Sequence, residues 1–121
     1  MSNKVLGDHG ESCAARYLGA QGYRILAQKY RTKIGEIDLI AKDRDTLVFV
    51  EVKTRRSVRC GLPAEAVNYR KQRKIIQTAM WYLREKRMDQ TPCRFDIVEV
   101  YAAGSEWGIH PLKGAFEVLG G

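Results

Sequence analysis

Two acidic residues and a lysine lie in two apolar stretches of this sequence, at a spacing that could support metal-dependent chemistry. Asp38 lies in the first stretch, and Glu51 and Lys53 lie in the second. Side chains of a strand alternate between its two faces, so Glu51 and Lys53 are expected to point to the same side. Charges within an apolar strand are costly unless they are paired or bind a metal ion. The pattern therefore indicates either a chemical site or a structural ion pair.

The two stretches are expected to pair as a hairpin, because the polar segment 42–45 separates them. The stretch that contains Glu51 is apolar on both faces, which is typical of a buried central strand. A hairpin that places Asp38 opposite Phe49 makes Glu51 its diagonal neighbour on one face, roughly 7–8 Å away. Strict alternation puts Ile37 and Leu39 together on the other face. A shift of the register by one residue would separate the two carboxylates.

A divalent cation could be held by Asp38 and Glu51, with the backbone carbonyl of Val52 as a further ligand. Ligands that are all oxygen favour Mg²⁺ or Mn²⁺ over zinc. Lys53 would position a water molecule or stabilise charge that develops on a phosphate. The alternative is that Lys53 forms an ion pair with Asp38 or Glu51 and that no metal binds.

Six stretches of the chain resemble a small bacterial family related to archaeal Holliday junction resolvases, within the PD-(D/E)XK nuclease superfamily. They cover most of residues 7–116 and read GESCAARYLGAQGYRILAQKYR, GEIDLIAKD, LVFVEVKTR, KQRKIIQTAMWYL, RFDIVEV and IHPLKGAF. The resemblance implies a metal-dependent endonuclease that hydrolyses phosphodiester bonds, and it favours DNA, including branched junction-like DNA, over RNA. It also leaves a homodimer open, because the resolvase relatives cut two strands as dimers.

Glu11 lies in the middle of the apolar face of an expected helix, beside Ala14, Ala15 and Leu18. It could cap or pair locally at the edge of the core. The resemblance implies instead that Glu11 joins the catalytic and metal-binding carboxylates. Gln72 has a similar pair of interpretations, because it could orient a water or a phosphate near the metal or lie at the boundary of the core.

The expected order is a helix, three strands, a second helix and one or two further strands, which predicts an α/β fold. Together with the resemblance, this order predicts a three-layer restriction-endonuclease-like domain over residues 1–121, with a central mixed sheet flanked by helices. The helices are expected at about residues 4–20 and 64–86, with Ile76, Ala79, Met80 and Leu83 as the apolar face of the second. The strands are expected at residues 23–30, 34–41, 47–53, 94–101 and 107–112.

The positive charge is concentrated next to the Glu51–Lys53 stretch. The net charge is +7, and eleven of the 21 Lys and Arg residues lie between Lys53 and Arg87. Phosphate contacts are therefore expected from Arg55, Arg56, Arg70, Lys71, Arg73 and Lys74. A solvated helix face would carry the same pattern.

Composition narrows the classes further. The three cysteines lie far apart without zinc-site spacing, and no signal segment or membrane-spanning stretch is visible, so we expect a cytoplasmic protein without a membrane partner. Two functions of other classes remain open. One is a nucleic-acid-binding module or adaptor that keeps the nuclease fold without cleaving, and the other is a structural protein whose basic face meets an acidic protein.

Overall fold

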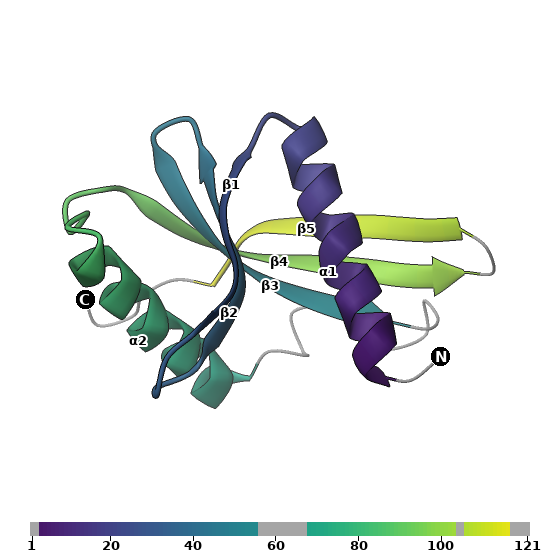
Figure 1. Ribbon diagram of the computed structural model, residues 1–121, viewed down its shortest axis with the longest axis horizontal. Coiled ribbons are helices and arrows are strands. Elements are labelled where there is room, and N and C mark those ends of the chain that lie inside the picture. Colours follow the sequence, from purple (N-terminus) through teal and green to yellow (C-terminus); the bar gives the residue numbers. More distant parts are fainter. Residues whose placement is uncertain (1–2, 56–67, 104–105, 117–121) are drawn as a thin grey trace.

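The computed structural model describes residues 3–55, 68–103 and 106–116. Its seven elements are α1 (Asn3–Ala20), β1 (Arg24–Arg31), β2 (Glu36–Asp43), β3 (Thr46–Arg55), α2 (Tyr69–Glu85), β4 (Cys93–Ala103) and β5 (Glu106–Phe116). Figure 1 shows the two helices on opposite sides of a strongly twisted sheet. Neither helix, within the part of the chain that the structure describes, is long and apolar enough to cross a membrane.

The five strands form one mixed sheet in the order β1-β2-β3-β4-β5. β3 and β4 run parallel, and the other neighbouring strands are antiparallel. Parallel strands need a crossover connection, and α2 lies in the segment between β3 and β4. The predicted α/β class and the mixed sheet between helices are confirmed, and the arrangement is compatible with a three-layer restriction-endonuclease-like fold.

Each face of the sheet has its own apolar core. Under α1, Ala14 and Leu18 pack with Val48, Val50 and Val52 of β3. Under α2, the alternate residues of β3 join Ile75, Ala79, Tyr82 and Leu83. Because β3 is buried on both sides, its side chains divide between the two cores as the period of two requires. Glu51 follows Leu47 and Phe49 on the α2 face.

The second helix begins later than predicted. Asn68 has extended backbone angles, and its side chain accepts a hydrogen bond from the backbone N–H of Lys71, which defines it as the N-cap. The helix therefore starts at Tyr69 rather than near residue 64. Its predicted apolar face was also partly wrong, since Met80 is half exposed while Ile75 and Tyr82 are buried.

The β2–β3 hairpin differs from its predicted register by two residues. Asp43 pairs with Thr46, so the turn lies at residues 44–45, and Leu39 pairs with Val50. One further step in this register sets Asp38 opposite Glu51. The shift is even, so the two carboxylates keep a common face as predicted, but they are direct rather than diagonal neighbours.

Alternation in β2 breaks next to Asp38, which the sequence did not predict. Ile37 and Ile40 lie an odd number of residues apart, yet both belong to the core under α2, whereas Leu39 belongs to the core under α1. The neighbouring strand is irregular at the same level, because Lys29 has a positive φ of 53°. Such a conformation interrupts a regular strand, so we attribute the break to this irregularity.

Candidate active site

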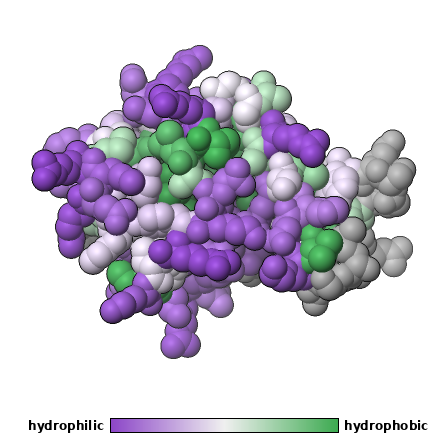
Figure 2. Space-filling view, in the orientation of Figure 1, coloured by the Kyte–Doolittle hydropathy of each residue, from purple (hydrophilic) through white to green (hydrophobic). Residues whose placement is uncertain are grey.

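A polar pocket lies between the start of α1 and the start of α2, at one end of β2 and β3. We call it the carboxylate pocket. Its volume is about 430 Å³, and it is lined by Leu6, Gly7, Glu11, Asp38, Glu51, Val52, Lys53, Thr54 and Lys71. All four predicted catalytic residues therefore line one pocket. Figure 2 shows hydrophilic residues over much of this face of the molecule, with a group of hydrophobic residues above its centre.

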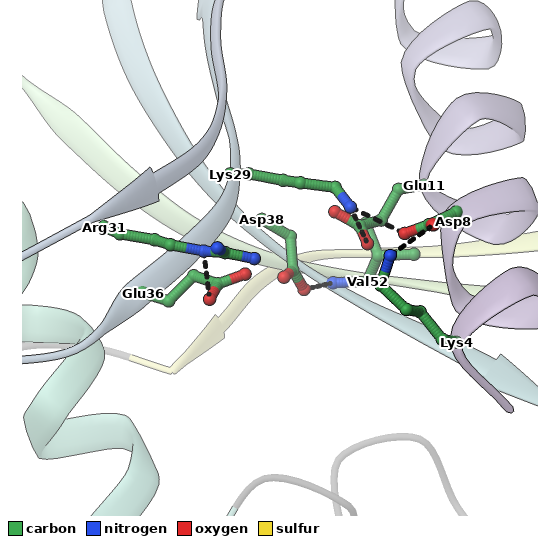
Figure 3. A network of polar contacts seen from close by, with 8 residues as sticks. All are labelled: Lys4, Asp8, Glu11, Lys29, Arg31, Glu36, Asp38 and Val52. Carbon is green, nitrogen blue, oxygen red and sulfur yellow. Dashed lines mark hydrogen bonds and ion pairs between the residues drawn. The ribbon is translucent and has the colours of Figure 1, made fainter.

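Asp38 lies in the centre of this region, with its carboxylate turned towards β3. Its Oδ2 accepts a hydrogen bond of 2.8 Å from the backbone N–H of Val52, as Figure 3 shows. Burial, followed by the negative charge of Glu51, raises the pKa of Asp38 to about 7. A carboxyl group whose ionisation is opposed by a neighbouring negative charge favours the arrival of a positive charge.

The ammonium groups of two lysines contact Glu51. Its Oε1 lies 2.8 Å from the Nζ of Lys71 and 3.5 Å from the Nζ of Lys53. Burial would lower the pKa of Lys71. The hydrogen bond to Glu51 and the other neighbouring groups outweigh burial, so the pKa of Lys71 is raised. Burial, and then the neighbouring Lys71, lower the pKa of Lys53. The two lysines therefore differ, since Lys71 is the firmly charged partner of Glu51 and Lys53 is the more acidic ammonium.

Glu11 reaches the pocket from α1. Its Oε2 lies 4.0 Å from the Nζ of Lys29, while its buried Oε1 has no hydrogen-bond partner among the described residues. Lys29 makes a shorter contact of 2.6 Å with Asp8, so it holds the start of α1 against β1 (Figure 3). Burial raises the pKa of Glu11, and Lys29 acts in the opposite direction.

A glycine places Glu11 over the pocket. Gly10 is buried, and a Cβ built at this position would overlap the side chain of Thr54 on β3. Only a residue without a side chain lets α1 approach β3 this closely. The same close approach brings Glu11, the next residue, to the edge of the carboxylate pocket.

The residues of the pocket fit a divalent cation in their chemistry. Asp38 and Glu51 supply oxygen ligands that Mg²⁺ and Mn²⁺ prefer, and Glu11 carries a buried oxygen that lacks a partner. Within the ranges that the structure describes, no three His, Cys, Asp or Glu side chains converge closely enough to hold one ion. The pair Asp38 and Glu51 is therefore the core of the candidate metal site, with Glu11 at its border.

The residues predicted to contact phosphates fall into separate groups. Arg70, Arg73 and Lys74 are exposed on α2, whereas Lys71 lies in the pocket against Glu51. Arg56 lies outside the described residues. Gln72 is half-buried on α2 but does not line the carboxylate pocket.

Arg55 also faces a carboxylate. Its Nε lies 3.7 Å from Oε2 of Glu99, a fully buried residue of β4 that pairs with Lys53 in the sheet. Neither carboxylate oxygen of Glu99 has a hydrogen-bond partner among the described residues. The sequence analysis missed Glu99, although an acidic residue within the apolar run 95–100 was a visible signal for it.

Comparison with known proteins places the chain in a family. A model of the "Uncharacterised protein family UPF0102" matches residues 10–100, which include every described residue of the site from Glu11 to Glu99. The chain belongs to the UPF0102 family. A UPF0102 protein of Syntrophotalea carbinolica is 47% identical over 115 residues, covering 95% of this chain and 94% of that protein. A UPF0102 protein of Symbiobacterium thermophilum is 54% identical over 100 residues, covering 83% of this chain and 84% of that protein.

Proposed function

We propose that this UPF0102 protein is a metal-dependent endonuclease that hydrolyses phosphodiester bonds in nucleic acid, with DNA as the preferred substrate. One observation carries the proposal. The half-buried carboxylate of Asp38 and the buried carboxylate of Glu51, on neighbouring strands, lie in one open pocket with the ammonium groups of Lys53 and Lys71. Acidic groups that bind a cation, next to basic groups that bind an anion, are the combination that hydrolysis of a phosphodiester requires.

Asp38 and Glu51 would hold Mg²⁺ or Mn²⁺ with the Val52 carbonyl as a further ligand, and Glu11, at the border of the site, would complete the ligand shell through water. The bound cation would offset the phosphate charge and make water a better nucleophile at neutral pH. In the reaction a water oxygen forms a bond to phosphorus, the bond from phosphorus to one bridging oxygen breaks, and a phosphate monoester and a hydroxyl group remain. Glu11 reaches the same pocket from α1, so its carboxylate is available to orient a ligand or a water molecule.

Lys53 and Lys71 would act on the phosphate in different ways. Lys71 is fixed by its 2.8 Å contact with Glu51, so it holds the carboxylate in place and contributes a permanent positive charge. Lys53 lies 3.5 Å from the same oxygen, so its ammonium would be in place to stabilise the charge that develops on the scissile phosphate. The exposed residues Arg70, Arg73 and Lys74 would bind the backbone of the substrate outside the pocket.

A second candidate is a nucleic-acid-binding module that does not cleave. The contact between Lys71 and Glu51 favours it, because this ammonium already neutralises one of the two carboxylates without a metal. Such a module would keep the basic face of α2 and bind nucleic acid equally well in a chelator. The two candidates therefore differ in the effect of the cation and not in the effect of salt.

The proposal is tested by incubating the purified protein with linear, flapped and four-way-junction DNA, and with the matching RNA, in Mn²⁺, in Mg²⁺ and in EDTA. We expect cleavage of at least one DNA form with either cation, and none in EDTA. Binding without cleavage in every cation would support the module instead. Absence of both binding and cleavage would contradict both candidates.

A further inference from the structure

A second pocket, which we call the Trp81 pocket, opens between α2 and the turn that joins β1 to β2. Its volume is about 510 Å³, and its wall includes Tyr30, Arg31, Lys33, Ile34, Trp81 and Glu85. Trp81 is 47% exposed and Ile34 is 39% exposed, although both side chains are large and apolar. Exposed apolar side chains that gather at one place with a polar rim mark a binding site more often than isolated ones do.

The Trp81 pocket is next to the candidate active site. A cavity of about 270 Å³ adjoins the carboxylate pocket, and both contain Asp38, Glu51 and Lys71. Gly35 lines this adjoining cavity, while the preceding residue, Ile34, lines the Trp81 pocket. Consecutive Cα atoms are about 3.8 Å apart, so a single turn of the chain separates the two spaces.

The turn that separates them is well defined. The backbone N–H of Thr32 donates to the carbonyl of Gly35 over 2.8 Å, and the Thr32 hydroxyl oxygen accepts from the backbone N–H groups of Ile34 and Gly35. The turn also packs on α2, because a Cβ at Gly35 would lie only 3.0 Å from Oγ1 of Thr78. The backbone of Ile34 is thus fixed at the wall of the pocket that Trp81 also lines.

One side of α2 connects the two spaces. Lys71, Lys74 and Trp81 follow one another at helical spacing, and Lys71 and Lys74 line the adjoining cavity while Trp81 lines the Trp81 pocket. Trp81 lies ten residues after Lys71, which corresponds to a rise of about 15 Å along the helix. This is the length of roughly four stacked nucleotides at 3.4 Å each.

The charge around the Trp81 pocket favours an anionic ligand. Lys33 and Arg31 lie in its wall, and the exposed Arg84 follows Trp81 on α2. Arg31 is paired with Glu36 over 2.9 Å, so Lys33 and Arg84 supply most of the positive charge. Glu85 is the acidic group of the wall, and it accepts a hydrogen bond of 3.3 Å from the hydroxyl of Tyr30. An exposed aromatic ring within a basic surface is the arrangement that binds unpaired bases, because the ring stacks on the base and the cations bind the backbone.

We propose that the Trp81 pocket receives an unpaired nucleobase from a strand whose phosphates reach the carboxylate pocket. The proposal rests on the proposed function, because it takes nucleic acid as the ligand of the neighbouring site. It makes the preferred substrate a strand with unpaired nucleotides, such as a flap, a fork or a single strand. A continuous duplex keeps its bases inside the stack and cannot fill the pocket.

The test measures binding in EDTA, so that it does not depend on cleavage. The chain has two tryptophans, and Trp107→Phe leaves Trp81 as the sole fluorescent indole. A short oligothymidylate should quench this fluorescence as it saturates the protein, and a blunt duplex should not. As the sole substitution in the chain, Trp81→Ala should weaken binding of the single strand roughly tenfold or more, while binding of the duplex stays the same.

Met80→Ala is the matched control, because Met80 is an equally exposed apolar residue on another side of the same helix. It should leave both affinities unchanged. Equal quenching by both ligands, or an unchanged single-strand affinity of the Trp81 variant, would overturn the proposal. Self-association that Trp81→Ala abolishes would also overturn it, since the pocket would then receive a second copy of the chain.

The outcome is separable from that of the proposed function. Cleavage by a protein whose Trp81 variant binds single strands normally would leave the nuclease proposal standing and remove this one. Quenching by the single strand but not by the duplex, without cleavage in any cation, would support this proposal and remove the nuclease proposal. Failure to bind either ligand in EDTA would overturn this proposal, while cleavage in Mn²⁺ or Mg²⁺ would decide the nuclease proposal separately.

Discussion

Asp38→Asn is expected to stabilise the folded protein at and above neutral pH when no divalent cation is present. The pKa of Asp38 rises from 3.8 to about 7 in the folded protein, through burial first and the charge of Glu51 second. A tenfold change in proton affinity corresponds to about 1.4 kcal/mol, so an ionised Asp38 costs the folded state up to about 4 kcal/mol. Asparagine removes this charge and can still accept the hydrogen bond from the backbone N–H of Val52.

The sign of the pH dependence follows from the direction of this shift. Between about pH 4 and pH 7 the folded protein keeps the proton on Asp38, while the unfolded chain releases it. The free energy of unfolding of the wild-type protein therefore falls as the pH rises through this interval, and the contribution is constant above it. The advantage of Asp38→Asn should be near zero at pH 4 and largest above pH 7.

The assay is urea denaturation of both proteins across this pH range in EDTA. Asp89→Asn is the control, because Asp89 is exposed and its loss should leave the difference near zero at every pH. Added Mn²⁺ should raise the stability of the wild-type protein and not that of Asp38→Asn. A variant that is less stable than wild type at pH 8, or a difference that does not change with pH, would refute the reasoning.

Three further predictions concern the elements around the pocket. Gly10→Ala should lower the free energy of unfolding by about 1–3 kcal/mol, because its Cβ would overlap Thr54; Gly19→Ala, whose Cβ meets no atom within 4 Å, should stabilise or change nothing. Glu11→Gln should reduce the rate of metal-dependent cleavage and leave the melting temperature nearly unchanged. A loss of cleavage that only accompanies unfolding, or full activity of the variant, would make Glu11 a structural residue. Lys53→Ala should retain Mn²⁺ and DNA affinity but lose cleavage by ~10²-fold or more, with incomplete rescue by Lys53→Arg, and wild-type cleavage would exclude its role in the reaction.

The sequence was sufficient to predict that Glu51 and Lys53 share a face, because alternation in a strand depends only on parity. Its prediction for Asp38 was right in face and wrong in position. The segment 42–45 contains no glycine to mark the turn, and the hairpin closes at Arg44, which itself adopts a positive φ of 57°. Two registers of equal parity fit the same apolar pattern, so only the structure distinguishes them.

The role of Lys71 could not be predicted from the charge pattern. In the sequence it is one of several basic residues in a cluster, and in the structure its ammonium lies 2.8 Å from Glu51. What decides this is the start of α2 at the Asn68 cap, which places Lys71 in the first turn facing the sheet. The requirement for glycine at position 10 could not be predicted either. It arises because α1 approaches β3 closely at this residue, and such an approach produces no periodic pattern in the sequence.

The most direct test of the central claim is single-turnover cleavage by the wild-type protein and by Glu51→Gln, purified in parallel and assayed in Mn²⁺ on the DNA form that the wild-type protein cuts best. Gln keeps the size of the side chain and removes a charge that the cation requires. We predict that both proteins bind the DNA and that the variant cleaves at least ~10²-fold more slowly. Equal cleavage by the two preparations, or a folded wild-type protein that binds DNA and cuts none of the forms tested, would contradict the account.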